Sequence, residues 1–126
     1  MPVLHADDAV VHELHGSVFT SYAAPARGSR ELCAWRLEVP PVSRGVPHII
    51  SKEEILLVLS GALRVTLDGA ATPAEAVPGD AILVPAGAQL QVDNPGPAPA
   101  TAWVTTSVGL EATVAGGATI RPPWTQ

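Results

Sequence analysis

The stretch Gly45-Val-Pro-His48-Ile-Ile-Ser-Lys-Glu-Glu54-Ile-Leu-Leu-Val-Leu-Ser-Gly61 decides the fold of this chain. It places one histidine and two carboxylates directly before an apolar run, and the run is followed by a glycine turn. Residues 55–59 are apolar at every position, a pattern that is typical of a strand buried on both faces. The sequence therefore predicts a buried strand with chemically useful side chains at its start.

In a second stretch, glycine and proline residues again separate short apolar runs: Gly79-Asp-Ala-Ile-Leu-Val-Pro85-Ala-Gly87-Ala-Gln-Leu90-Gln-Val-Asp-Asn94. Residues 81–84 predict a short strand that ends at Pro85, because proline has no N–H to donate to a ladder. Residues 90–93 predict the next strand, and the turn Asn94-Pro-Gly-Pro follows it.

Short strands are also predicted on either side of these stretches. Proline and glycine, 13 and 11 of 126 residues, are spread between short apolar runs, which indicates many strands joined by turns. Asp68-Gly69 predicts a hairpin turn. No long amphipathic helix pattern is present, so the predicted fold class is all-β, a sandwich or small barrel. After a weakly helical or extended start, the predicted strands cover residues 16–22, 31–39, 54–59, 62–67, 81–84, 90–93, 100–108 and 112–120.

The composition limits the function classes. A chain of 126 residues with 47% hydrophobic and 15% charged residues is typical of one globular domain. The net charge of −5 and the lack of a basic cluster disfavour nucleic-acid binding. The apolar runs stop well short of the roughly 20 residues of a membrane helix. With one cysteine and no visible secretory signal, we expect a cytoplasmic protein without a nucleic-acid or membrane partner.

The first stretch resembles the first motif of the cupin superfamily. That motif reads Gly, five residues, His-x-His, three or four residues, Glu, six residues, Gly. The chain matches it at His48, Glu54 and Gly61. It departs from it at Val42, in the first glycine position, and at Ile50, in the second histidine position.

The second stretch resembles the second cupin motif. That motif reads Gly, five residues, Pro-x-Gly, two residues, His, three residues, Asn. Leu90 stands at the histidine position. The matching residues are Gly79, Pro85, Gly87 and Asn94.

The resemblance covers roughly residues 30–110 and implies a double-stranded β-helix, or jelly-roll barrel. It implies one domain over residues 1–126, with the terminal extensions packed on the barrel or on a partner chain. In the family, three histidines and the glutamate bind a metal inside the barrel, and here only His48 and Glu54 keep ligand-type side chains. Metal sites usually take three or four protein donors, so we expect no metal cofactor, and a divalent ion held by this pair is disfavoured. Further donors would have to come from His12, His15, Glu53 or Gln89.

The resemblance also directs Glu54 into the barrel, and the two-residue alternation of a strand then sends Leu56 and Val58 inward. Desolvation among aliphatic side chains should raise the pKa of Glu54 unless His48 pairs with it. We therefore predict that His48 and Glu54 are a general acid/base pair. The expected pocket-lining residues are Ile50, Leu56, Val58, Gln89 and Leu90.

Three functions follow from this arrangement. The first is a metal-independent isomerase, epimerase, dehydratase or cyclase acting on a small apolar organic substrate. The resembled family includes metal-free sugar epimerases and barrels encoded beside natural-product pathways. The second is a non-catalytic cupin that binds a small molecule or has only a structural role. In the structural case His48 bonds a neighbouring strand, and Glu54 pairs with Arg36, Arg64 or Lys52. The third is a metal-dependent dioxygenase or isomerase with a non-standard ligand set.

Other candidate residues are interpreted as structural. The spacing of His12 and His15 suits a metal only on a helix, and Gly16 follows at once, so we expect surface or edge-strand positions. Cys33 is expected to be a small core residue. The stiff tail Arg121-Pro-Pro-Trp124 should pack its indole on the barrel mouth or on a partner.

The outer side of the 54–59 strand predicts a partner. If one face fills the lumen, then Ile55, Leu57 and Leu59 face outward. A second subunit would cover this apolar patch, so we expect a homodimer joined sheet to sheet.

Overall fold

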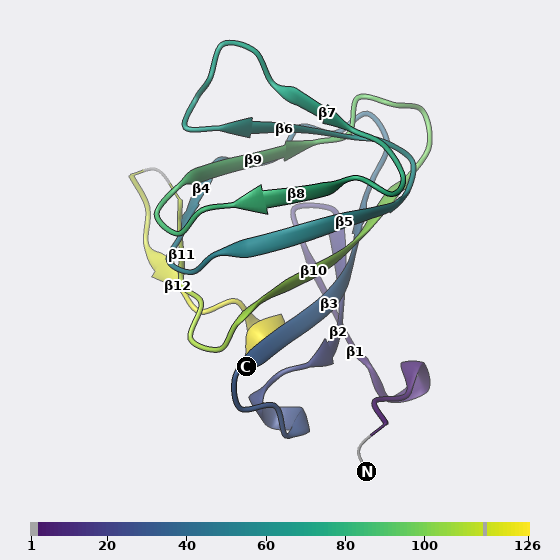
Figure 1. Cartoon of the computed structure of the whole chain (residues 1–126), viewed down its shortest axis with the longest axis vertical. Helices are drawn as coiled ribbons and strands as arrows, with labels where there is room; N and C mark the ends of the chain where they lie inside the picture. Colours follow the sequence, from purple (N-terminus) through teal and green to yellow (C-terminus); the bar gives the residue numbers. More distant parts are fainter. Residues whose placement is uncertain (1–2, 115) are drawn as a thin grey trace.

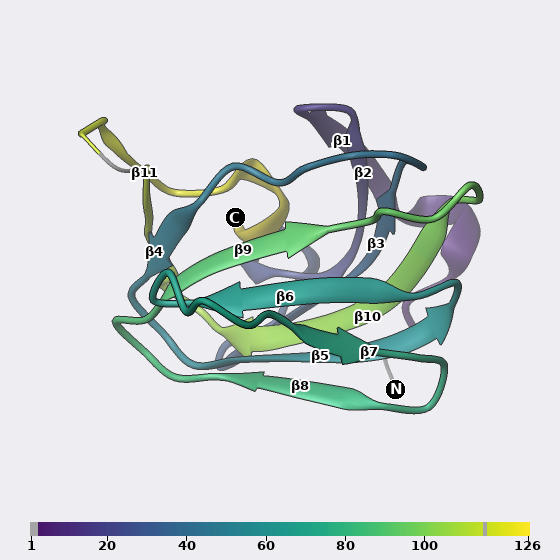
Figure 2. The ribbon, with the colours of Figure 1, turned by 90° about the horizontal axis from the view of Figure 1, so that it is seen from above.

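Two six-stranded antiparallel sheets face each other in the computed structural model, which describes residues 3–114 and 116–126 (Figures 1 and 2). The first sheet has the order β1-β2-β3-β10-β5-β8 and the second the order β12-β11-β4-β9-β6-β7. The strands of the first sheet are β1 (Val10–Leu14), β2 (Ser17–Ala23), β3 (Leu32–Val39), β10 (Ala100–Ser107), β5 (Glu54–Ser60) and β8 (Ala81–Val84). Those of the second are β12 (Thr119–Ile120), β11 (Ala112–Val114), β4 (His48–Ile50), β9 (Gln89–Asp93), β6 (Leu63–Leu67) and β7 (Ala74–Ala76).

The core lies between the sheets and follows strand alternation. Every second residue of β3, from Cys33 to Val39, is buried, and β5 buries Glu54, Leu56 and Val58. The other face of β5 is exposed in the single chain, so its predicted burial on both sides holds for one side only. The expected outward direction of Ile55, Leu57 and Leu59 agrees with this pattern.

Three glycines of the two motifs have backbone dihedral angles in the left-handed region, which turns often require. Gly61, Gly79 and Gly87 have φ values of 71°, 94° and 84°. Val42, which replaces the first motif glycine, keeps the same conformation with φ of 50°. Gly61 is also required for a steric reason, because a Cβ atom at this position would lie 2.8 Å from the Cα of Ala100.

Most predicted strands are present with ends shifted by one or two residues, and four details differ. The strands β1, β4 and β7 were not predicted, because two of them are only three residues long and the third is exposed at nearly every position. The single strand predicted over 112–120 is instead two strands, β11 and β12, that pair with each other.

Helical structure is limited to single turns in the described part of the chain. The 3₁₀ turns are η1 (Ala6–Asp8), η2 (Pro25–Arg27) and η3 (Pro123–Thr125). Within residues 3–114 and 116–126, no helix has the length and apolar character needed to cross a membrane.

The C-terminal tail packs on its own barrel. Trp124 is buried and stacks on Phe19, with ring centroids 3.7 Å apart and planes 10° from parallel. The hydroxyl of Ser21 donates to the Trp124 carbonyl at 2.8 Å, and the amide of Ala26 donates to the Gln126 carbonyl at 2.8 Å. The tail is therefore part of the barrel wall beside β2.

Candidate functional site

A cavity of about 170 Å³ lies between the sheets. Cavities of roughly 150 Å³ accept a molecule of the size of benzene, so this volume suits a small ring compound. Its mouth is marked by the exposed lining residues Leu14, His15, Arg44, Val46 and Ile120. Most other lining residues are apolar: Phe19, Trp35, Leu37, Val39, Ile50, Leu56, Leu90, Val92, Val104, Leu110, Ala112, Val114, Pro122 and Trp124.

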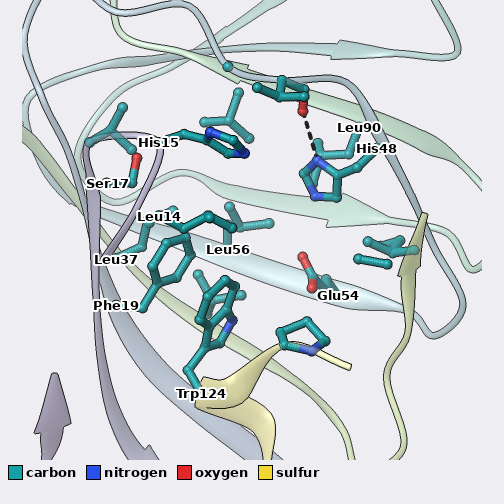
Figure 3. Close-up of a pocket in the computed structure, with 18 of the residues that line it drawn as sticks. Leu14, His15, Ser17, Phe19, Leu37, His48, Glu54, Leu56, Leu90 and Trp124 are labelled. Carbon is teal, nitrogen blue, oxygen red and sulfur yellow. Dashed lines mark hydrogen bonds between the residues drawn. The ribbon is translucent and has the colours of Figure 1, made fainter. Parts of the chain in front are cut away.

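Glu54 is the carboxylate of this cavity wall. It begins β5 between Thr106 of β10 and Val84 of β8, and its side chain points into the cavity (Figure 3). The residue is only 6% exposed. Across the described residues, no hydrogen bond or ion pair reaches its carboxyl group. Burial without a partner raises the pKa of Glu54 from 4.5 to about 7.

The structural pairing that the sequence left open for Glu54 is not present in the described residues. Arg64 instead pairs with Glu75 across β6 and β7, at 2.8 Å. The second ion pair of the described chain joins Arg121 to Glu111 at 3.6 Å. The carboxyl group of Glu54 is thus free to meet a ligand.

His48 lies above Glu54 in the same cavity (Figure 3). Its Nδ1 lies 2.9 Å from the carbonyl oxygen of Val46. A carbonyl oxygen only accepts, so Nδ1 carries the proton, and Nε2 of the neutral ring is an acceptor. That second nitrogen lies on the side of the ring that faces Glu54 (Figure 3). The described contacts include no hydrogen bond between the two side chains, so they face each other across space that a bound molecule can fill.

The residues of the cavity do not fit a cupin metal. Ile50 and Leu90 stand at two of the four ligand positions, are 1% and 2% exposed, and both line the cavity. Neither side chain has an atom that coordinates a metal. Across residues 3–114 and 116–126, no group of three or more His, Cys, Asp or Glu side chains is placed to hold an ion.

The expected pocket-lining residues divide into two groups. Ile50, Leu56 and Leu90 lie in the cavity wall. Val58 is 1% exposed but belongs to the core cluster beyond the cavity, because the barrel interior is filled at that point of β5. Gln89 lies outside the wall, because its neighbour Leu90 points inward and strand alternation turns Gln89 away.

Two parts of the wall were not predicted from the sequence. One is the β1–β2 hairpin, which contributes Leu14, His15, Ser17 and Phe19. The other is the C-terminal segment, which contributes Ile120, Pro122 and Trp124. The prediction for the tail gave the barrel mouth or a partner chain as its packing site, and the structure places Trp124 on the barrel, in the wall of the cavity.

Trp35 is a second polar group without a partner at this site. It is 3% exposed, lines the cavity, and has a buried Nε1 that makes no hydrogen bond in the described chain. The other buried side chains near the cavity are satisfied or apolar. Cys33, fully buried on the same strand, lies 3.5 Å from the Thr125 carbonyl, and burial raises the pKa of its thiol. It is the small core residue that was predicted.

Comparisons with known proteins agree with this architecture. The chain is similar to the polyketide cyclase RemF from Streptomyces resistomycificus, with a TM-score of 0.80 and 18% identity over 90% of this chain and 84% of that one. It is also similar to a sugar phosphate isomerase of the cupin superfamily from Silicibacter pomeroyi, with a TM-score of 0.69 and 22% identity over 95% and 92%. A third similar structure is the 7S globulin of Momordica charantia, with a TM-score of 0.75 and 17% identity over 90% and 37%.

Identities this low show the shared fold and leave the activity open. No curated protein matches the sequence. The sequence profile described as "Cupin domain" matches residues 35–107, more than half of the chain and including both motifs. The two facing antiparallel sheets are thus the predicted jelly-roll barrel, and the chain belongs to the cupin family.

Proposed function

We propose that this cupin is a metal-independent acid/base catalyst that acts on a small apolar carbonyl compound bound in the cavity. The observation that carries the proposal is the carboxyl group of Glu54, which is buried without a partner and has its pKa raised to about 7. A group with this pKa exists in both protonation states near neutral pH. It can therefore accept a proton and return it within one catalytic cycle.

The chemistry that suits this group is proton transfer next to a carbonyl. The ionised Glu54 carboxylate takes a proton from the carbon beside the carbonyl, and the C–H electron pair becomes part of an enolate. If the substrate has a C=C bond next to this carbon, the electron pair is delocalised over a dienolate, and the protonated carboxyl returns the proton to the γ-carbon, which is a double-bond isomerisation. Alternatively the enolate carbon attacks a second carbonyl and the resulting alkoxide takes the proton, which closes a ring. His48, on the opposite side, accepts a hydrogen bond through Nε2 from a hydroxyl group of the substrate.

The lining favours an apolar substrate over a sugar phosphate. A phosphate group in this wall would meet mostly aliphatic and aromatic side chains, and burial of an unpaired charge is costly. A compound of the polyketide kind, with carbonyl groups on a carbon skeleton, suits both the wall and Glu54. The similarity in fold to a polyketide cyclase supports this choice of substrate class.

Deuterium exchange tests the proposal without knowledge of the natural substrate. Phenylacetone carries an apolar ring beside an activated CH₂ group, and ¹H NMR in D₂O follows the loss of its CH₂ signal. We expect the wild-type protein to speed this exchange, by about 100-fold or more if the geometry is productive. Glu54→Gln should remove the acceleration. Glu53→Gln is the matched control, because Glu53 is the adjacent residue and is exposed.

The result also separates catalysis from binding alone. Exchange no faster than in buffer, or equal exchange by wild type and Glu54→Gln, would contradict the catalytic proposal. Phenylacetone that shifts the resonances of cavity residues without exchanging would favour the alternative, a cupin that binds such a compound without converting it.

A further inference from the structure

His15 occupies a backbone position that another residue type would fill more easily. It lies with Gly16 in the two-residue turn between β1 and β2, where Leu14 pairs with Ser17. Both turn residues have positive φ, 51° for His15 and 82° for Gly16. Turns of this kind prefer Asn-Gly, and non-glycine residues in the left-handed region are uncommon. The turn therefore has no need of an imidazole.

The hairpin places that imidazole at the cavity. His15 and its neighbours Leu14 and Ser17 belong to the lining. Figure 3 shows the His15 ring entering the cavity from the hairpin, across from His48 and above Glu54. The expectation that His12 and His15 are edge-strand or surface residues is correct for their location, but only His15 reaches the cavity.

The space between these three side chains has the size of a molecule. His15, His48 and Glu54 line one cavity, yet they are not close enough to form a cluster that could hold a single ion. Besides the single carboxylate, the lining contains the Arg44 guanidinium and the His15 imidazole, and both groups can donate hydrogen bonds to a ligand. Such a rim suits ligand oxygens, while the wall below suits a hydrocarbon body.

We propose that His15 is a ligand-binding residue that donates a hydrogen bond to an oxygen of the bound compound, opposite His48 and Glu54. The ligand class is an aromatic or alicyclic compound with oxygen functions, such as a hydroxyaryl ketone. The inference uses the same cavity as the proposed function and rests on it for the substrate class. It makes the β1–β2 hairpin part of the binding site.

Binding of two probes of similar shape tests this proposal. 4-Hydroxyacetophenone offers oxygens to the rim, and 4-ethyltoluene offers none. His15→Asn suits the turn, since Asn adopts positive φ readily, and it removes the imidazole N–H that reaches the cavity. His15→Gly removes the side chain and also accepts this backbone conformation. His5→Asn is the control, because His5 is exposed and lies outside the lining.

Titration followed by NMR gives the affinities. We expect both His15 variants to bind 4-hydroxyacetophenone about three- to tenfold more weakly than wild type, the effect of one hydrogen bond, with 4-ethyltoluene unchanged. The His15 ring signals should move in the wild-type protein when 4-hydroxyacetophenone is added.

Equal affinity in the wild type and the His15 variants would overturn the proposal, as would equal losses for both probes. Failure of the wild type to bind either probe would overturn it together with the cavity as a ligand site. Because this readout is binding, it is independent of the exchange experiment. A catalytically inert protein that still shows the His15 effect would refute the proposed function alone.

Discussion

The carboxyl group of Glu54 lies in an environment that favours its protonated form. It is surrounded by apolar side chains, and in the described residues it has neither a cation nor a hydrogen-bond donor beside it. At a pH well above 7 the folded protein must hold an unpaired buried charge, which costs free energy. The protonation state of Glu54 should therefore affect the free energy of unfolding as well as the activity.

The free energy of unfolding should fall as the pH rises through the window between about 4.5 and about 7. Over this range the folded state keeps a proton on Glu54 that the unfolded chain has already released, so raising the pH favours unfolding. The stabilising contribution is complete below the lower value and lost above the upper one, up to about 3 kcal/mol for the full shift. Glu54→Gln lacks this contribution, so it should lose less stability than wild type between about pH 5 and about pH 8.

Urea denaturation of both proteins at the two pH values measures this difference. Identical pH dependence in wild type and Glu54→Gln would mean that the carboxyl group is not buried in its neutral form.

Val42 offers a second test at the scale of one residue. A β-branched residue at φ of 50° is strained by roughly 1–3 kcal/mol, and Val42 is 79% exposed, so little packing is lost when its side chain is removed. Glycine, which the resembled motif has here, accepts this conformation but costs about 0.5–1 kcal/mol of chain entropy. Val42→Gly should therefore stabilise the protein by about 1 kcal/mol in thermal or urea denaturation. A clear loss of stability would show that Val42 contributes packing that its exposure does not reveal.

At the scale of elements, the C-terminal turn η3 is the part whose placement matters most for the cavity. Trp124 packs on Phe19 of β2 and also lies 6.4 Å, centroid to centroid, from Trp35 of β3. Trp124→Ala should lower the free energy of unfolding by about 3–5 kcal/mol, as expected for loss of a large buried ring, and should open the cavity wall. Trp124→Phe is the control, since it keeps an aromatic ring against Phe19 and should lose much less. A loss below about 1 kcal/mol for the alanine variant would mean that the tail is not held on the barrel in solution.

The elements that the sequence predicts well are those with strong local signals. Gly61 and Gly79 mark turns that β-strands flank, and Pro85 ends β8 as its missing N–H requires. The short strands β4 and β7 have too few residues to show a period of two. The single strand predicted over residues 112–120 overlooks Gly116-Gly117, a turn signal that lies between β11 and β12.

The site could be predicted only in part, for a related reason. Glu54, Leu56 and Leu90 were placed by motif register and alternation, which are local properties. His15 and Trp124 reach the same cavity from opposite ends of the chain, and only tertiary packing brings them there. The prediction that Gln89 lines the wall conflicts with strand alternation, because its neighbour Leu90 points inward, and the structure places Gln89 outside the wall.

At the scale of the whole molecule, one outer sheet face is not covered by any of residues 3–114 and 116–126. Ile55, Leu57, Leu59 and Leu83 on β5 and β8 are 40–57% exposed. We propose that a second copy packs on this face, because a patch of this kind is unusual on a free monomer and the same patch on two copies is self-complementary.

Sedimentation equilibrium at micromolar concentration tests the dimer. We expect a mass of twice the 13.0 kDa chain, and Leu57→Glu should reduce it to that of one chain while the fold is kept. Ile49→Glu is the control, since Ile49 is 42% exposed and lies on β4 of the other sheet. A wild-type mass of one chain would contradict the dimer and leave the function of the cavity untouched.

The central claim is that an apolar cupin cavity holds a carboxyl group whose pKa is close to neutral pH. A measurement of the pKa of Glu54 tests this claim most directly. Protein labelled with ¹³C at the glutamate side-chain carboxyl carbons can be titrated by NMR, and the Glu54 signal is assigned by its absence in Glu54→Gln. We predict a midpoint near pH 7. A midpoint at or below the ordinary value of 4.5 would show a charged carboxylate that is solvated or paired, and would remove the basis for acid/base catalysis at this site.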